Sequence, residues 1–469
     1  HFSFIRYDCF MKNKINNSIY FIFFIFTLSI SYYLGVAFFD ITTGLDFNKY
    51  VLNLNFFSGK DIKVYDSQGS LYFWTISNFS GYSDELYNTS NLKTLINNKI
   101  QLINLAYYVL GLGGLGLLLK IKEISFKNIL LSFSILNFFP TAFYFRLTMK
   151  PEIMAFAILP WIFVLFVYYF NHRSSSITSL LVILLSVCLT IKGSITGMIL
   201  LSLPLLYRKK LLKLKDNLYL FCGTFAFSSL FIYFNFFLTG KFLFGRPTVV
   251  DQSLVNRWNN TADLSFFTNI DFTNLYENPF KHLHSDSFVS ITLLDTLADY
   301  FTFFWKHDQK GNFFQHDKIQ FTDNFLIQTF LPDYISIIFT ITFYFLIVIL
   351  YIFGIKDKEF LLLPLCGLSV LIINSLGFPN KNFNPETGDL FKVHYYSFFI
   401  SISLVFLLNY FYKHFNLSRH LSILLIPIFF ITMGFPKDLS EKNLDGVMDK
   451  LEHTLICSVI DNFNNVVCK

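Results

Sequence analysis

Residues 18–39 read SIYFIFFIFTLSISYYLGVAFF and contain no charged side chain. A continuous apolar stretch of this length is sufficient for an α-helix to cross a bilayer. The rest of the chain has the same character, because 54% of its 469 residues are hydrophobic and 14% are charged, with a mean hydropathy of +0.50. Soluble domains carry about 25% charged residues. The sequence therefore predicts an all-α polytopic membrane protein.

Further apolar segments follow residues 18–39, which gives about eleven transmembrane helices by the length criterion. They lie at about 100–119, 129–145, 153–170, 177–191, 194–207, 217–239, 334–354, 360–378, 393–412 and 420–435. A basic segment and the first apolar stretch follow Met11 directly, so we expect Met11 to be the first residue of the protein.

The basic residues are concentrated in alternate loops, which predicts a cytoplasmic N-terminus. The short loops on the opposite, external side hold only Arg146, Lys150, Lys192, Lys381 and Lys392. The net charge of +6 comes mostly from the short inside loops and therefore indicates topology and not nucleic-acid binding. The inside loops contain Lys120, Lys122, Lys127, Arg173, Arg208, Lys209, Lys210, Lys213, Lys215, Lys356, Lys358, Lys413 and Arg419.

This topology divides the chain into four parts. Residues 11–239 form an N-terminal transmembrane bundle that includes a first external loop over residues 40–99. Residues 240–333 form a large external loop that folds as a cap, residues 334–435 form the C-terminal transmembrane helices, and residues 436–469 form an external tail. Cys457 and Cys468 in this tail are either joined by a disulfide, as an oxidising compartment permits, or free thiols.

Two carboxylates follow the first apolar stretch directly. Asp40 and Asp46 are predicted to lie at the mouth of the first transmembrane helix, close to lipid but outside the hydrocarbon. Acidic groups at this depth need water, a cation or a substrate beside them, so both are candidate functional residues. The alternative is that Asp40 only ends the helix and Asp46 faces water.

Residues 146–152, RLTMKPE, form the second candidate site. We expect a short external connection between two helices, with two cations and a carboxylate at the membrane surface. Arg146 and Lys150 suit a phosphate at the level of the lipid head groups, arginine through its planar fork and lysine as a point charge. The alternative is that both side chains only extend from the apolar region to the interface.

The third candidate is KVHYY at residues 392–396, before the tenth apolar segment. Lys392 and His394 could contact a phosphate or a sugar, whereas Tyr395 and its neighbour could equally belong to an aromatic belt. Histidine and aspartate residues also occur in the cap, but their spacing matches no recognised zinc site, and no metal is predicted. GLGGLG at residues 111–116 lies inside an apolar segment, so it predicts close helix packing and not a dinucleotide site.

Four of these features, in this order, resemble the C-type (GT-C) superfamily of integral membrane glycosyltransferases. They are the acidic first external loop, the RLTMKPE connection, the large external cap and the KVHYY element. The superfamily includes the protein O-mannosyltransferases and the bacterial lipid A aminoarabinose transferases, which take a sugar from a polyprenyl-phosphate carrier. The resemblance covers most of the chain as architecture. The adjacent acidic pair familiar in the superfamily is absent, and Asp40 and Asp46 are spaced apart, so either could be the base.

The resemblance implies inverting transfer of the sugar to a hydroxyl of a glycan, lipid or protein acceptor on the outer face of the membrane. Asp40 or Asp46 would take the proton of that hydroxyl. Arg146 and Lys150 would stabilise the charge that develops on the carrier phosphate.

The same resemblance implies supporting roles for other residues. Glu152 would orient a cation, and Lys392, His394 and Tyr395 would contact the phosphate or the acceptor. This chemistry requires no cofactor, although it is compatible with a divalent cation at the phosphate. The implied location is the inner membrane of a bacterium, with the large loops and the tail in the periplasm.

Two other classes of protein fit the same pattern. An O-antigen polymerase or ligase also has many helices and large external loops, and it would be expected to use Arg246 and Arg257 instead of Asp40. A non-enzymatic transporter is the other alternative, although the sequence shows no convincing internal repeat.

Overall fold

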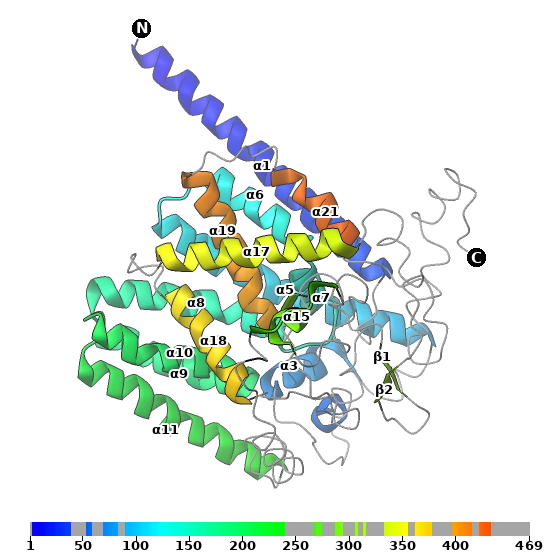
Figure 1. Cartoon of the computed structure of the whole chain (residues 1–469), viewed down its shortest axis with the longest axis vertical. Coiled ribbons are helices and arrows are strands. Elements are labelled where there is room, and N and C mark those ends of the chain that lie inside the picture. The colour runs from blue at the N-terminus through cyan, green and yellow to red at the C-terminus, as the bar shows by residue number, and fades with distance from the viewer. Residues whose placement is uncertain are drawn as a thin grey trace.

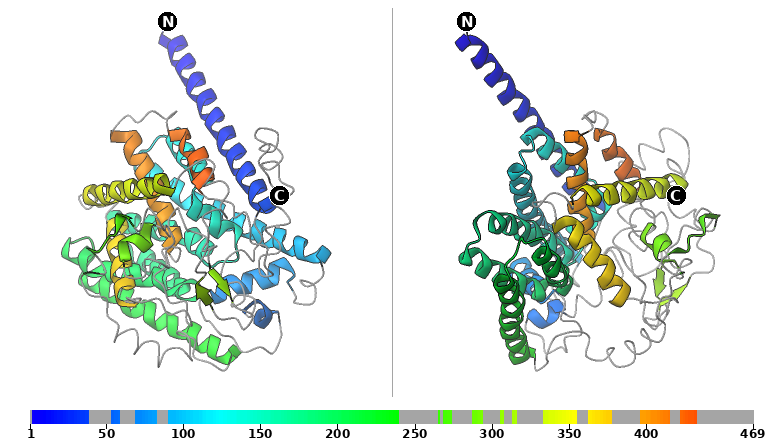
Figure 2. Two further views of the ribbon diagram at one scale, coloured as in Figure 1. Left: turned by 45° about the vertical axis from the view of Figure 1, so that its right-hand side comes forward. Right: turned by 60° about the vertical axis from the view of Figure 1, so that its left-hand side comes forward.

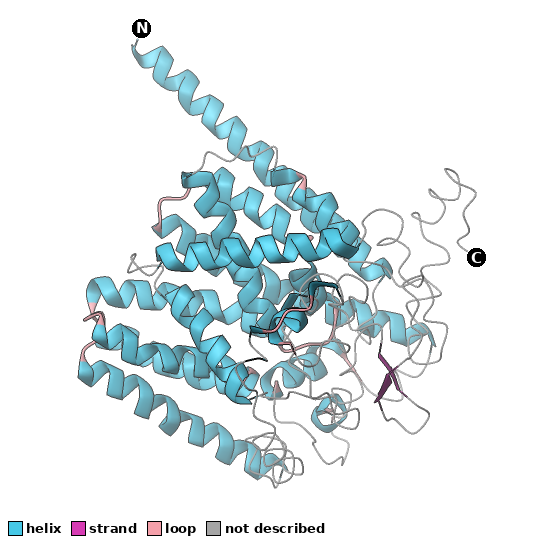
Figure 3. Ribbon diagram, in the orientation of Figure 1, coloured by secondary structure: helices cyan, strands magenta, loops and turns pink. Residues whose placement is uncertain are grey.

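The computed structural model describes residues 2–38, 53–58, 69–82, 90–239, 265, 268–273, 287–293, 305–307, 313–315, 333–354, 362–377, 396–414 and 422–432. Within these ranges the fold is almost entirely helical (Figure 3). The helices are α1 (Phe2–Phe38), α3 (Ser70–Ser80), α5 (Ser90–Ile121), α6 (Phe126–Leu136), α7 (Pro140–Leu147), α8 (Glu152–His172), α9 (Ser175–Ile191), α10 (Gly193–Arg208), α11 (Leu214–Thr239), α15 (Phe288–Leu293), α17 (Asp333–Gly354), α18 (Leu362–Gly377), α19 (Ser397–His414) and α21 (Leu425–Thr432). A short antiparallel ribbon joins β1 (Trp305–His307) to β2 (Phe313–Gln315).

Each apolar segment predicted from the sequence overlaps at least one described helix, but fewer of them qualify as membrane spans. Among the described residues, three helices are long and apolar enough to cross a bilayer, at Asn17–Val36, Leu95–Ile121 and Glu152–His172. The shorter apolar helices are Ser175–Ile191, Gly193–Arg208, Ile341–Phe353 and Ser397–Lys413. Most of the predicted cap and all of the tail lie outside the described residues, whereas the loop over residues 40–99 is described at 53–58, 69–82 and 90–99.

The predicted segment 129–145 is not one helix. It divides into α6 and α7, whose axes differ by 73°, and the pair counts as a fourth candidate span only if both halves are taken together. The division has a local cause, because Pro140 begins α7 and the ring of a proline disfavours helical geometry in the residue before it. The bend places the last turn of α7 among other helices.

The glycine-rich stretch 111–116 packs α5 closely against α8, as predicted. A Cβ on Gly111 would lie 2.6 Å from the Phe156 ring and 2.7 Å from the Phe156 carbonyl oxygen, so no side chain fits there. A Cβ on Gly114 would lie 3.0 Å from Pro160. Small residues at such contacts let two helix backbones approach each other.

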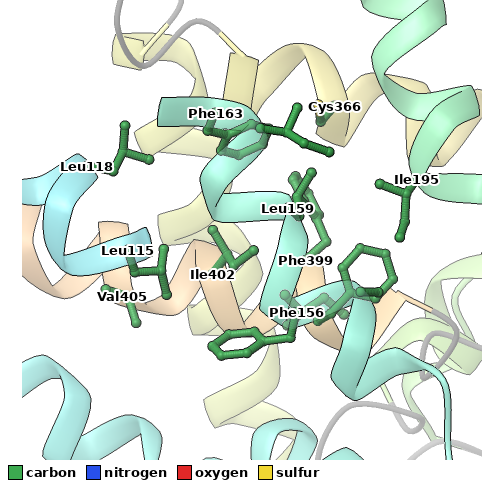
Figure 4. Packing of buried hydrophobic residues seen from close by; sticks show 14 of the residues in the cluster. Leu115, Leu118, Phe156, Leu159, Phe163, Ile195, Cys366, Phe399, Ile402 and Val405 are labelled. Atoms are coloured by element: carbon green, nitrogen blue, oxygen red, sulfur yellow. The ribbon is translucent and has the colours of Figure 1, made fainter. Parts of the chain in front are cut away.

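The apolar core lies where α5, α8, α10, α18 and α19 meet. In the view of Figure 4, Leu118 of α5 and Phe163 of α8 lie in the upper part, and Leu115 of α5 lies below them with Ile402 and Val405 of α19. All of these side chains are almost completely buried. In contrast, the first turns of α1 extend beyond the other helices in each view (Figures 1 and 2).

Side-chain contacts establish the directions of the central helices. Gly111 faces Phe156 and Gly114, one turn later, faces Pro160, so α5 and α8 run parallel. Ser186 Oγ donates to the Thr224 carbonyl at 3.2 Å, and further contacts earlier in both helices make α9 and α11 parallel as well.

These directions define two ends of the bundle. The α5–α6, α8–α9 and α10–α11 turns lie at one end, here called the basic end because the predicted inside loops fall there. Two of these turns are visible as loops at the left edge of Figure 3. The α7–α8 turn, the α9–α10 break and the start of α3 lie at the opposite end.

Candidate functional site

Polar side chains gather at the opposite end, around residues 146–152. Gly69 precedes α3 with a φ of 79°, and a Cβ there would lie 2.9 Å from the side chain of Pro151. Ser70 Oγ donates to the Thr190 carbonyl at 3.1 Å, near the end of α9. These contacts hold the start of α3 against both the α7–α8 turn and the α9–α10 break.

Arg146 lies in the last turn of α7 and is fully buried, with 0% of its surface exposed. Its Nη2 donates to Ser31 Oγ at 3.0 Å and to the Asn137 carbonyl at 3.3 Å. Its Cζ lies 5.0 Å from the centroid of the Tyr108 ring and 5.4 Å from that of Phe143. Nε and Nη1 have no acceptor among the described residues. A buried guanidinium with two open donors favours a bound anion.

The exposure of Arg146 and Lys150 differs from both sequence interpretations. The predicted external connection contains only residues 148–151, because Arg146 still belongs to α7. The alternative that both side chains extend to the membrane–water interface does not fit their burial, since 0% of Arg146 and 3% of Lys150 is exposed. The reason is the bend before α7, which directs this short helix into contact with α1, α5 and α19.

A polar face of α5 supports the α7–α8 turn. Gln101 Nε2 donates to the Leu147 carbonyl at 3.2 Å, and Asn104 Nδ2 donates to the Thr148 carbonyl at 2.9 Å. Asn104 Oδ1 in turn accepts a hydrogen bond of 3.0 Å from the Tyr72 hydroxyl of α3. Carbonyls that follow the end of a helix need such partners when they are buried. The sequence interpretation missed these amides, although their spacing of three residues places them on one helix face.

Glu152 forms a buried ion pair with Lys192. Lys192 Nζ lies 2.5 Å from Glu152 Oε1, and only 7% and 2% of the two side chains is exposed. Glu152 is in the first turn of α8, where a carboxylate interacts favourably with the helix dipole, and its Oε2 has no hydrogen-bond partner among the described residues. The sequence assigned Lys192 only to a short external loop. It lies instead in the α9–α10 break, turned inward.

Four charged side chains are buried at this end of the bundle, namely Arg146, Lys150, Glu152 and Lys192. Burial raises the pKa of the Tyr72 hydroxyl, which therefore remains protonated as the donor to Asn104. The open Nε and Nη1 of Arg146 are suited to bind an anionic group, and the open Oε2 of Glu152 is suited to accept a hydrogen bond from a hydroxyl.

The other predicted site residues, namely Asp40, Asp46, Lys392, His394 and Tyr395, lie outside the described residues, as do Arg246, Arg257, Cys457 and Cys468. The helix that leads to Asp40 is described. Ser31 contacts Arg146, and a Cβ on Gly35 would overlap the Leu147 side chain, so the end of α1 packs on α7. No group of metal-binding side chains occurs in the part of the chain that the structure describes.

Comparisons with protein-family models, with curated proteins and with solved structures find no match for this chain.

Proposed function

We propose that this chain is an integral membrane glycosyltransferase that moves a sugar from a polyprenyl-phosphate carrier to an acceptor hydroxyl. The observation that supports this proposal is the buried Arg146, whose Nε and Nη1 point to no acceptor in the described part of the protein. A phosphate diester would supply acceptor oxygens to both groups, and its lipid tail would remain within the bilayer. The proposed location is a bacterial inner membrane, with the site on the periplasmic side and the N-terminus in the cytoplasm.

The proposed reaction forms a bond between the acceptor oxygen and the anomeric carbon of the sugar. The bond from that carbon to the phosphate oxygen breaks at the same time, which inverts the anomeric configuration. Asp40 or Asp46 takes the proton of the acceptor hydroxyl. Arg146 and Lys150 stabilise the negative charge left on the carrier phosphate. The contacts of α1 with Arg146 and Leu147 bring the chain immediately before Asp40 to the same end of the bundle.

Glu152 has a positioning role in this proposal. Its ion pair holds the Lys192 ammonium beside the start of α8, while Oε2 is open to a hydroxyl of the donor sugar or the acceptor. Lys392, His394 and Tyr395 are proposed to complete the binding of the phosphate or the acceptor.

The test is to incubate the purified protein with a panel of polyprenyl-phosphate sugars and to measure released carrier phosphate. We expect Asp40→Asn or Asp46→Asn to abolish transfer without loss of expression. Arg146→Gln should lower the rate on the order of 10²–10³-fold, as loss of a charge-stabilising donor does. Arg173→Gln, which removes an exposed arginine at the basic end, is the matched control and should leave the rate unchanged. Full activity of both aspartate variants would refute the catalytic assignment.

The break between α6 and α7 favours one other function, transport of an organic anion. Transporters bind substrates where helices are interrupted, and here a 73° bend precedes the buried Arg146. Flux of a lipid-linked or soluble anion into proteoliposomes, with no new glycosidic bond formed, would support transport over transfer.

A further inference from the structure

The basic end of the bundle carries an exposed group of cations that the proposed reaction does not use. This cationic face consists of Arg173, Arg208, Lys209, Lys210, Lys213 and Lys215, all of which are exposed. The nearest carboxylate in the sequence is Asp216, and it accepts a hydrogen bond from the Tyr169 hydroxyl of α8. The face therefore has six basic side chains and one carboxylate close to them in the sequence.

Hydrogen bonds hold the two turns of the cationic face in a defined arrangement. Arg173 Nη2 donates to the Lys210 carbonyl at 3.3 Å, which ties the α8–α9 turn to the α10–α11 turn. The Lys210 amide donates to the Tyr207 carbonyl at 2.8 Å, and the Leu211 amide donates to the Leu206 carbonyl at 3.0 Å. The second turn is thus an ordered cap on α10, and its lysines are presented outward from a fixed backbone.

The cationic face is continuous with an exposed apolar surface. Tyr207 and Leu214, beside the lysines, are 45% and 54% exposed. One turn further along α11, Leu218 and Tyr219 are 55% and 46% exposed, and Phe221 and Phe225 continue the same apolar side of the helix. Charged groups directly above apolar helix surface match a molecule with an anionic head and hydrocarbon chains. A soluble acidic protein or a nucleic acid would leave the apolar part of this surface uncovered.

We propose that the cationic face binds the head groups of anionic phospholipids, while their acyl chains lie along the outer surface of α11 and α10. Lysine and arginine near a membrane surface each contribute about 1 kcal/mol to attraction for anionic lipids. This inference does not depend on the proposed glycosyl transfer, because the face lies at the other end of the bundle.

The experiment uses the full chain in a mild detergent, titrated with phosphatidylglycerol or with phosphatidylcholine of the same acyl composition. Bound lipid is counted by native mass spectrometry. We expect phosphatidylglycerol to bind preferentially. The triple variant Lys209→Gln, Lys210→Gln, Lys213→Gln should bind it on the order of 100-fold more weakly, from three lysines at about 1 kcal/mol each.

Two further variants separate site-specific binding from general charge and from misfolding. The control variant Lys120→Gln, Lys122→Gln, Lys127→Gln removes the same charge from the α5–α6 turn and should retain binding. Replacing Lys209, Lys210 and Lys213 together by arginine should also retain it. Equal binding of the two lipids would overturn the proposal, as would equal loss in both glutamine variants. Competition by inorganic phosphate as strong as that by phosphatidylglycerol would show a site for soluble anions instead.

Discussion

Replacing Lys192 by methionine removes the cation from the buried ion pair and leaves the Glu152 carboxylate without it. The two side chains are 7% and 2% exposed, so solvent screens this pair very little. At their separation of 2.5 Å the attraction is about 7 kcal/mol for an effective dielectric constant of about 20. Each buried ion loses several kcal/mol of hydration, so the attraction mainly offsets that loss.

The expected consequence is a large effect of each single change and a small effect of both together. Lys192→Met or Glu152→Leu alone should lower the free energy of unfolding by about 3–5 kcal/mol, because the remaining buried charge loses its partner in the ion pair. The double variant has neither charge, and its stability should lie within about 1 kcal/mol of the original protein. The two substitutions should therefore be strongly non-additive.

Stability can be measured by titrating the detergent-solubilised protein with sodium dodecyl sulfate and following tryptophan fluorescence. Lys209→Met removes an exposed lysine at the basic end and should change the free energy of unfolding by less than about 0.5 kcal/mol. A Lys192→Met variant as stable as this control would show that the ion pair does not stabilise the fold. A double variant that loses the sum of the two single effects would show that Lys192 and Glu152 have no interaction energy.

Two further predictions concern the contacts that position the site. Gly111→Ala should destabilise the protein by about 1–3 kcal/mol, because its Cβ would lie 2.7 Å from the Phe156 carbonyl oxygen. At Gly113 an added Cβ would lie 3.6 Å from the nearest side-chain atom, so Gly113→Ala should be neutral or stabilising by up to about 1 kcal/mol. The same denaturation assay compares the two alanine variants. Equal stability of both would contradict the close packing at Gly111. Tyr72→Phe removes the donor to Asn104 and should cost about 1–3 kcal/mol, with an unchanged melting curve as the contrary result.

The sequence was a good guide to the helices because hydropathy depends on the side chains of each segment alone. Residues 18–39 and 153–170 illustrate this, since both fall on helices long and apolar enough to span a bilayer. The division of the segment 129–145 was missed, although Pro140 was a visible signal for it. The apolar composition continues through the break, so the hydropathy pattern predicted one helix despite Pro140.

The candidate site was predicted less completely, for a different physical reason. Arg146, Lys150 and Glu152 were identified from their charge, but their burial depends on how α7 packs among distant helices. Lys192 was assigned to a loop because its partner lies forty residues earlier in the chain. The residues next to Lys192 in the sequence do not indicate a partner so far away in the chain. The spacing of Gln101 and Asn104 was a local signal, and a search for polar faces on apolar helices would have found it.

The two ends of the bundle use cations in opposite ways, and this contrast bears on function. At the basic end Arg173, Arg208, Lys209, Lys210, Lys213 and Lys215 are exposed, and hydration stabilises their charges. At the opposite end Arg146 has lost that hydration, and two hydrogen bonds and two aromatic rings replace only part of it. Methionine or leucine at this position would pack in the same core without leaving donors open. An anion bound to Nε and Nη1 would satisfy the two open donors, which packing alone does not do. The proposed chemistry is placed at Arg146 for this reason.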